Sequence, residues 1–156
     1  SKEFIHAIDI ETNSKIGMEV VMHSSKKSKS LKKIDRPKAY IIKKNQSEII
    51  EKLDINGIKT IIIENDTTLS AGSYTVTAYK DDFKIYEKMK MQDVDVRIDY
   101  SDIQFSKGDL ILPMKQKKSN LIAELMEPEA PNSYVSFGLI KTGINKILPI
   151  YRIREL

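Results

Sequence analysis

Two stretches of this 156-residue chain alternate apolar and polar side chains with a period of two. They are residues 73–79 and residues 93–100. A period of two places the apolar side chains on one face of a β-strand and the polar side chains on the other. We therefore expect antiparallel sheet with one buried face and one solvated face.

A helix is predicted shortly before this sheet begins. Asn45 and Glu48 have the spacing of a capping box, in which each side chain satisfies a free backbone amide at the start of a helix. Gly57 can end the helix because glycine readily adopts the left-handed conformation of a C-cap. The apolar stripe between these two signals consists of Ile49, Ile50 and Leu53.

The segments on either side of this helix are predicted strands. Residues 39–42 form a short apolar run, and residues 58–64 are nearly all apolar and β-branched, as expected of a strand that is covered on both faces. Strand, helix and strand in close succession predict a right-handed βαβ unit with parallel strands. With a second short helix at about residues 119–126 and a strand at residues 109–112, the expected fold class is α+β, a βαβ unit combined with a largely antiparallel sheet.

The two ends of the chain add further predicted strands. Residues 3–10 and 16–22 are rich in β-forming side chains and are joined by a turn-like segment. The last strand is expected at residues 148–153, where Ile150 and Arg152 share one face. We expect a single domain over residues 1–156, because 156 residues and 40% hydrophobic side chains suffice for one core.

A basic tract interrupts this domain. Residues 26–38 contain seven Lys or Arg residues and one Asp, which leaves 19 basic and 21 acidic residues for the rest of the chain. Ser-Lys tracts without aromatic side chains are typical of solvated linkers. We therefore predict a loosely ordered basic loop at about residues 24–36.

The chain contains no recognised catalytic motif. There is no Cys, and the two histidines, His6 and His23, lack the converging partners that a catalytic zinc site requires. The motifs G-x-S-x-G and G-x-G-x-x-G and the Walker sequence are absent, and the acidic residues at 93–99 do not match a calcium-binding loop. We predict no catalytic residue, no metal ligand and, without an apolar run of 18 residues, no membrane span.

One loop carries carboxylates in a rigid setting. Pro128 and Pro131 stiffen the residues after the second predicted helix. Glu127 and Glu129 could act as a general acid and base pair of a small hydrolase if a cleft held them at the right separation. Alternatively, Glu127, Glu129 and Tyr134 form a domain interface, or the prolines only shape a turn and Tyr134 packs inward.

Several motifs agree in order and spacing with a known family. They are residues 38–42 (Lys-Ala-Tyr-Ile-Ile), residues 47–53, the step from Asn56 to Ile58, residues 107–113 ending in Pro113, then Gln116, residues 121–126, Glu127-Pro-Glu129 and residues 133–138. This pattern resembles the region after the catalytic domain in a bacterial group of zinc metallocarboxypeptidases of the carboxypeptidase A type. Phe137 stands where that family usually has Trp, and Lys43 stands where Pro is common.

The resemblance covers about residues 38–139 and implies a role. The implied role is that of a noncatalytic C-terminal accessory domain, structural or substrate-guiding, in a secreted or periplasmic carboxypeptidase. Its expected partner is the catalytic domain of the same polypeptide. The resemblance places the family's zinc ligands, an H-x-x-E motif and a third His, in that catalytic domain. No position of this chain matches them.

A second class of function follows from the basic tract. A free-standing binding module could use this arm to hold nucleic acid or an anionic cell-surface polymer. Binding to nucleic acid would be nonspecific, because the tract has no aromatic side chain on which a base could stack. An H-x-x-E motif encoded upstream in the same reading frame would favour the accessory domain over this alternative.

We predict that the isolated chain neither binds zinc tightly nor hydrolyses peptides. Two separate histidines and no Cys cannot assemble three protein ligands around an open metal position. Metal analysis of tag-free protein after dialysis against zinc should find far less than one zinc per chain. Stoichiometric zinc, or peptide hydrolysis that a chelator abolishes, would contradict the prediction.

Overall fold

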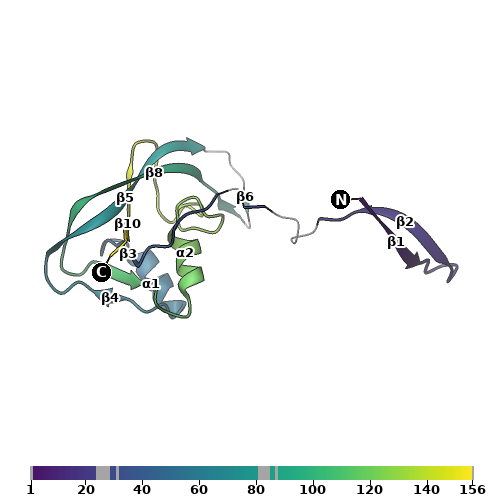
Figure 1. The fold of residues 1–156 in the computed structure, drawn as a ribbon, viewed down its shortest axis with the longest axis horizontal. Coiled ribbons are helices and arrows are strands. Elements are labelled where there is room, and N and C mark those ends of the chain that lie inside the picture. The colour runs from purple at the N-terminus through teal and green to yellow at the C-terminus, as the bar shows by residue number, and fades with distance from the viewer. Residues whose placement is uncertain (1, 24–28, 31, 81–84, 87, 156) are drawn as a thin grey trace. The chain divides into compact units, whose positions relative to one another are not determined.

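The computed structural model describes all residues except 1, 24–28, 31, 81–84, 87 and 156 (Figure 1). The chain divides into two compact units, Ser1–Asp35 and Arg36–Leu156. The division falls within the basic segment, most of whose Ser-Lys tract lies outside the described residues. The loosely ordered basic loop therefore stays a prediction.

The first unit is a β-hairpin. Strand β1 (Lys2–Ile8) pairs antiparallel with β2 (Lys15–Val21), which confirms the two strands predicted there. In the turn between them, Asp9 Oδ1 accepts hydrogen bonds from the backbone N–H groups of Glu11 and Thr12 at 2.8 and 3.2 Å. Such bonds explain why a short polar segment joins the strands.

The second unit is built on a six-stranded sheet with the strand order β4-β9-β3-β10-β5-β8, and every pairing in it is antiparallel (Figure 1). Two helices and a small two-stranded hairpin complete the described part of the unit, which confirms the α+β class. None of the helices among the described residues is long and apolar enough to cross a membrane. The sheet strands are β3 (Ala39–Ile42), β4 (Ile61–Ile62), β5 (Thr67–Lys80), β8 (Asp93–Phe105), β9 (Leu110–Pro113) and β10 (Ile147–Ile153); the helices are α1 (Ser47–Ile55) and α2 (Ser119–Met126); the hairpin is β6 (Ile85–Tyr86) with β7 (Met89–Lys90).

The predicted βαβ unit consists of β3, α1 and β4. Both strands pair antiparallel with β9, so they run in the same direction with β9 between them. The sequence predicts that residues 58–64 form a strand buried on both faces. This is wrong for β4, where Ile61 and Ile62 are 55% and 62% exposed. They are exposed because β4 is a two-residue strand at the edge of the sheet.

Helix α1 begins one residue later than predicted from the capping box, which placed Asn45 at the N-cap. Gln46 occupies the N-cap and makes no side-chain capping bond, so the predicted Asn45 cap is wrong. Asn45 instead accepts a hydrogen bond from the side-chain amide of Gln46 at 3.1 Å. The backbone N–H of Gln46 donates to Lys43 at 3.1 Å, and this turn places Asn45 one residue too early to cap the helix.

The end of α1 follows the prediction. Gly57 has a φ of 59°, its N–H donates to Asp54 at 2.7 Å, and the N–H of Ile58 donates to Leu53 at 2.9 Å. These two bonds form a Schellman motif, in which a left-handed residue turns the chain away from the helix. The motif brings Leu53 and Ile58 into the core.

The helices cover one face of the sheet, where the larger core lies (Figure 1). Tyr40 and Tyr74 contribute to this core from the sheet, and Leu53 and Ile122 contribute from the two helices. The other face carries a smaller cluster of Ala39, Ile41, Ile63, Ala71, Phe105 and Ile153. Successive residues of β3 and β10 therefore point alternately into the larger core and into the smaller cluster. Ile150 lies in the larger core, on the face that the sequence predicted for Ile150 and Arg152.

Strand β5 contains a bulge that the alternation did not predict. Its register with β8 shifts between Val76 and Ala78. The predicted alternation holds at Tyr74 and Val76, which are buried, and changes phase after the bulge. Tyr79, expected on the polar face, is therefore partly buried against the larger core.

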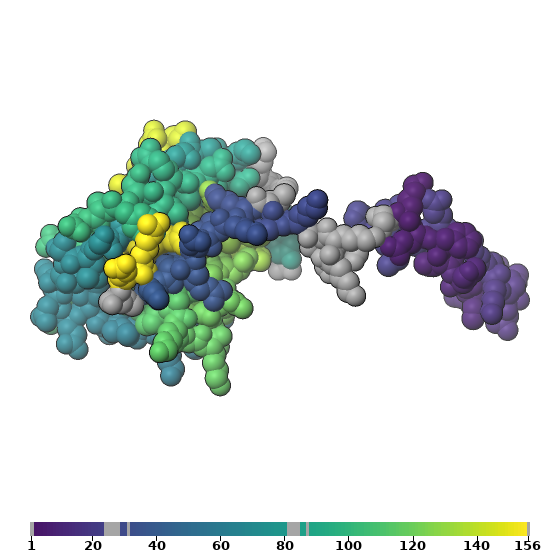
Figure 2. Space-filling model, viewed as in Figure 1, coloured from purple at the N-terminus to yellow at the C-terminus, as the bar shows by residue number. Residues whose placement is uncertain are grey.

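The start of the second unit runs along its surface into β3 (Figure 2). Arg36 lies over the beginning of α2, where its guanidinium donates to Ser119 Oγ at 3.3 Å and to Asn120 Oδ1 at 2.6 Å. These hydrogen bonds connect the segment before β3 to the first turn of α2.

We predict that Gly57→Ala lowers the free energy of unfolding by about 1 kcal/mol, because an L-residue is strained in the left-handed conformation. Denaturant unfolding measures the change. Gly143→Ala is the control, since a Cβ at Gly143 meets nothing within 4 Å, and it should change stability by less than about 0.5 kcal/mol. Equal effects of the two substitutions would show that the Schellman turn does not stabilise the unit.

Candidate functional site

The loop that follows α2 is held by hydrogen bonds from its own serines. We call residues 127–136 the proline loop. Ser133 Oγ donates to the carbonyl of Pro128, and Ser136 Oγ donates to that of Pro131, both at 3.0 Å. The N–H of Ser136 donates back to Ser133 Oγ at 2.9 Å. The carbonyls of Pro128 and Pro131 therefore have hydrogen-bond donors within the loop, and the two proline rings restrict its backbone.

Glu127 begins this loop and points into the core, where it is 9% exposed. The hydroxyl of Tyr40 donates to Glu127 Oε1, and the hydroxyl of Tyr74 donates to Oε2 at 3.0 Å. Arg152 Nε lies 3.7 Å from Oε1. The carboxylate thus joins β3, β5 and β10 to the end of α2.

The electrostatics of this cluster explain why a carboxylate is tolerated inside. Burial raises the pKa of both Tyr40 and Tyr74, and the nearby charge of Glu127 raises it further. The two phenols therefore stay protonated and serve as hydrogen-bond donors. Two hydrogen-bond donors and an arginine offset the cost of burying this carboxylate, whereas the loss of one partner would leave a buried charge or hydroxyl uncompensated.

Glu129 lies two residues further along and faces the surface. Its Oε1 accepts a hydrogen bond from the backbone N–H of Val96 on β8 at 2.9 Å. This bond covers part of the outer edge of the sheet, since β8 is an edge strand. Glu127 and Glu129 thus have separate partners, and the structure does not bring them together as a general acid and base pair.

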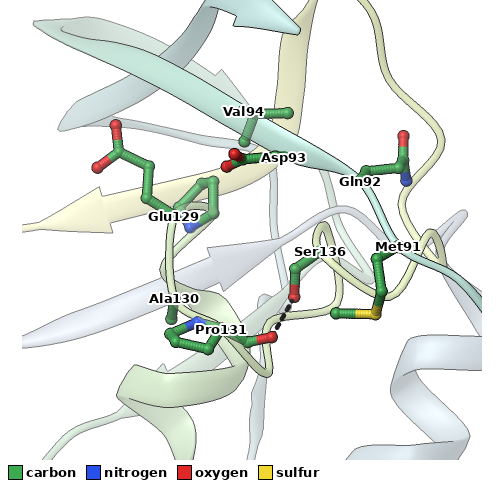
Figure 3. A pocket seen from close by; sticks show the side chains of 9 residues that line it. Met91, Gln92, Asp93, Val94, Glu129, Ala130, Pro131 and Ser136 are labelled. Carbon is green, nitrogen blue, oxygen red and sulfur yellow. Dashed lines mark hydrogen bonds between the residues drawn. The ribbon is translucent and has the colours of Figure 1, made fainter. Parts of the chain in front are cut away.

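A pocket opens where the proline loop passes the start of β8 (Figure 3). Its volume is about 260 Å³. Asp93 lines it from the start of β8 and Glu129 lines it from the proline loop, so each side contributes an acidic residue (Figure 3). The remaining lining residues are mostly apolar or neutral and are Met91, Gln92, Val94, Pro128, Ala130, Pro131 and Ser136.

A second pocket, of about 360 Å³, shares Met91 and Gln92 with the first. Two lysines line it, Lys90 from β7 and Lys141 from the segment before β10. The other lining residues are Tyr79, Phe137, Gly138 and Thr142. The two pockets therefore differ in charge and have a common wall.

This common wall is anchored to the proline loop. The N–H of Gln92 donates to the carbonyl of Ser136 at 2.7 Å, and its side-chain amide donates to that of Val135 at 3.0 Å. Gly138 has a φ of 71°, and a Cβ there would lie 3.2 Å from Gln92 Nε2. Glycine at this position leaves room for the glutamine that separates the pockets.

The residues considered for metal binding lie apart from these pockets in sequence. His6 is on β1, with its ring centroid 5.5 Å from that of Phe4, and His23 follows β2. Within the described parts of the chain, no three His, Asp or Glu side chains are placed to hold a metal ion together. The acidic residues Asp93, Asp95 and Asp99 are exposed, which confirms the predicted solvated face.

The three residues predicted for a domain interface have different environments. Glu127 and Tyr134 are buried, Tyr134 at 5% exposure, whereas Glu129 lines the first pocket. The inward packing of Tyr134 agrees with the alternative in which the prolines shape a turn. The interface itself stays a prediction, and Glu129 is its surface-facing member.

Sequence reasoning missed the partners of Glu127 and the basic pocket. Arg152 was the available signal, because a lone arginine in the apolar run 147–153 requires an acidic partner if it is buried. Lys90 and Lys141 are far apart in the sequence and carry no such signal.

We predict that Glu127→Ala lowers the free energy of unfolding by about 3 kcal/mol, because it removes the acceptor of two buried phenols and the carboxylate that faces the buried Arg152. Glu127→Gln should cost less, about 1–2 kcal/mol, since the amide oxygen still accepts one bond. The exposed Glu51→Gln is the matched control and should have no measurable effect. Denaturant unfolding of the three variants provides the comparison, and stability equal to the parent in Glu127→Ala would exclude the structural role.

Comparison with known proteins finds similarity to part of three fungal proteins. They are named Carboxypeptidase 2 and come from Trichophyton tonsurans, Trichophyton rubrum and Trichophyton equinum, and each is 26% identical to this chain over 118 or 119 residues. The match covers 76% of this chain and 22% of each relative, so the chain spans about a fifth of the length of the curated relatives it matches. No family model and no solved structure matches the chain. The similarity supports a carboxypeptidase-related domain, as the sequence motifs implied, but with fungal rather than bacterial relatives.

Proposed function

We propose that this chain is a noncatalytic accessory domain of a carboxypeptidase-like peptidase, with a structural or substrate-guiding role. The observation that carries the proposal is the match to 22% of each Carboxypeptidase 2, which leaves most of those proteins outside the aligned part. The catalytic domain of the same polypeptide is the proposed partner, and zinc is assigned to that domain. The proposed location of the whole protein is secreted or periplasmic.

The chemistry of the proline loop supports a role other than catalysis. Glu127 is held by Tyr40, Tyr74 and Arg152, an arrangement that suits stability. Glu129 is held by a backbone amide of β8. A general acid or base must reach a substrate proton, and burial keeps Glu127 from doing so.

The two neighbouring pockets support the substrate-guiding form of the proposal. They are lined by charged side chains and lie beside a loop that internal hydrogen bonds stabilise. A shaped, charged surface next to a peptidase can bind the substrate chain and raise its concentration near the active site.

The first test is to determine which other domains the reading frame of this chain encodes. An accessory domain requires a catalytic domain with an H-x-x-E zinc motif in the same polypeptide. A frame without such a domain would overturn the proposal and favour the alternative of a free-standing module with a basic arm.

The second test uses the longer polypeptide. We predict that Glu129→Lys in that protein raises KM for peptide hydrolysis or lowers the melting temperature of the catalytic domain, because it reverses the charge beside the first pocket. Glu51→Lys, on the exposed part of α1, is the matched control and should change neither quantity. Unchanged KM, kcat and melting temperature in both variants would show that this surface does not serve the peptidase.

A further inference from the structure

Two pockets of opposite charge share one wall in the second unit. We call the pocket with Asp93 and Glu129 the acidic pocket, and the one with Lys90 and Lys141 the basic pocket. Met91 and Gln92 line both. A ligand that occupies both pockets would contact lysine side chains in one pocket and carboxylates in the other.

We propose that the two pockets together bind the C-terminal residue of a peptide when that residue is lysine or arginine. The basic pocket takes the terminal carboxylate, and the acidic pocket takes the cationic side chain. This inference rests on the proposed function, because it names the substrate class that a substrate-guiding domain would hold.

The acidic pocket has the composition that a long cationic side chain requires. Lysine and arginine have apolar stems, which pack on apolar surface while the charged head stays with polar groups. Met91, Ala130 and Pro131 are at least partly exposed and provide apolar surface, and Asp93 and Glu129 provide the charge (Figure 3). The N–H of Val96 holds Glu129 Oε1 and so limits the freedom of this carboxylate before a ligand arrives.

The basic pocket offers donors for a carboxylate. The ammonium groups of Lys90 and Lys141 supply positive charge, and Tyr79 supplies a phenol. Thr142 also lines this pocket, and its buried Oγ1 has no hydrogen-bond partner among the residues that the structure describes. Phe137 adds an aromatic wall, with its ring centroid 6.3 Å from that of Tyr86.

The combination of charges discriminates between ligand classes. A polyanion would be repelled by Asp93 and Glu129, and a cation without a carboxylate would gain no attraction from the basic pocket. A lysine or arginine with a free carboxylate carries both charges at opposite ends of one residue. The peptide C-terminus and the free amino acid share this chemistry, and we assign the site to the peptide because the pockets are open at the surface.

Peptide titration of the full 156-residue chain, followed by calorimetry and by backbone amide NMR signals, tests the proposal. The probe is N-acetyl-glycyl-lysine with a free carboxylate, which should bind and shift the amide signals of Gln92 and Asp93. Its C-terminal amide and N-acetyl-glycyl-glutamate should each bind at least about threefold more weakly, since each loses one of the two exposed charge contacts.

Variants then assign the two ends of the ligand. Glu129→Gln, which keeps an acceptor for the N–H of Val96, and Lys141→Gln should each weaken binding of the probe by about threefold to fivefold. The matched controls are Asp102→Asn, on the same strand as Asp93, and Lys117→Gln, before α2, and both should bind like the parent. Lys141→Gln should reduce the preference for the free carboxylate over the amide, since Lys90 remains in the pocket.

Three results would overturn the proposal. They are equal binding of the acid and the amide, equal binding of the lysyl and glutamyl peptides, and variants indistinguishable from their controls. Free lysine binding as tightly as the peptide would overturn the assignment to a peptide C-terminus. Because the titration measures no peptidase activity, a negative result leaves the accessory role standing, and a positive one stands even if the reading frame lacks a catalytic domain.

Discussion

The buried carboxylate of Glu127 is the contact on which the second unit depends. It accepts hydrogen bonds from Tyr40 on β3 and Tyr74 on β5, and it faces Arg152 on β10. A charge inside a protein must be paired and hydrogen-bonded, so each of these side chains restricts where the others can lie. The cluster therefore fixes the end of α2 against three neighbouring strands of the sheet.

The rigidity of the proline loop follows from this anchor. Glu127 and Pro128 are buried, the chain then reaches the surface at Pro131, and the hydroxyls of Ser133 and Ser136 close the two turns at Pro128 and Pro131. The loop then reaches the outer edge of β8, where Glu129 accepts the N–H of Val96. An edge strand with a covered amide is less open to pairing with another chain.

The two pockets result from the same arrangement. The loop passes the start of β8, and Gln92 is tied to it through two carbonyls, those of Ser136 and Val135. The wall between the pockets is thus held by backbone acceptors of the loop. Carboxylates lie on one side of this wall and lysines on the other, so the charges that recognise a ligand are placed by the loop that also completes the core.

Local signals in the sequence determined the elements of this protein. The alternation in residues 93–100, the helix that ends at Gly57 and the strand faces of Ile150 and Arg152 are all found in the structure, because period and glycine geometry depend on neighbouring residues alone. Tertiary structure decided that β9 lies between β3 and β4, that a bulge turns Tyr79 inward, and that Lys90 and Lys141 share a pocket. These outcomes depend on contacts between residues far apart in the chain, for which a single sequence carries no local pattern. The lone Arg152 in an apolar strand indicated that a buried acid had to exist, but only packing selected Glu127 as its partner.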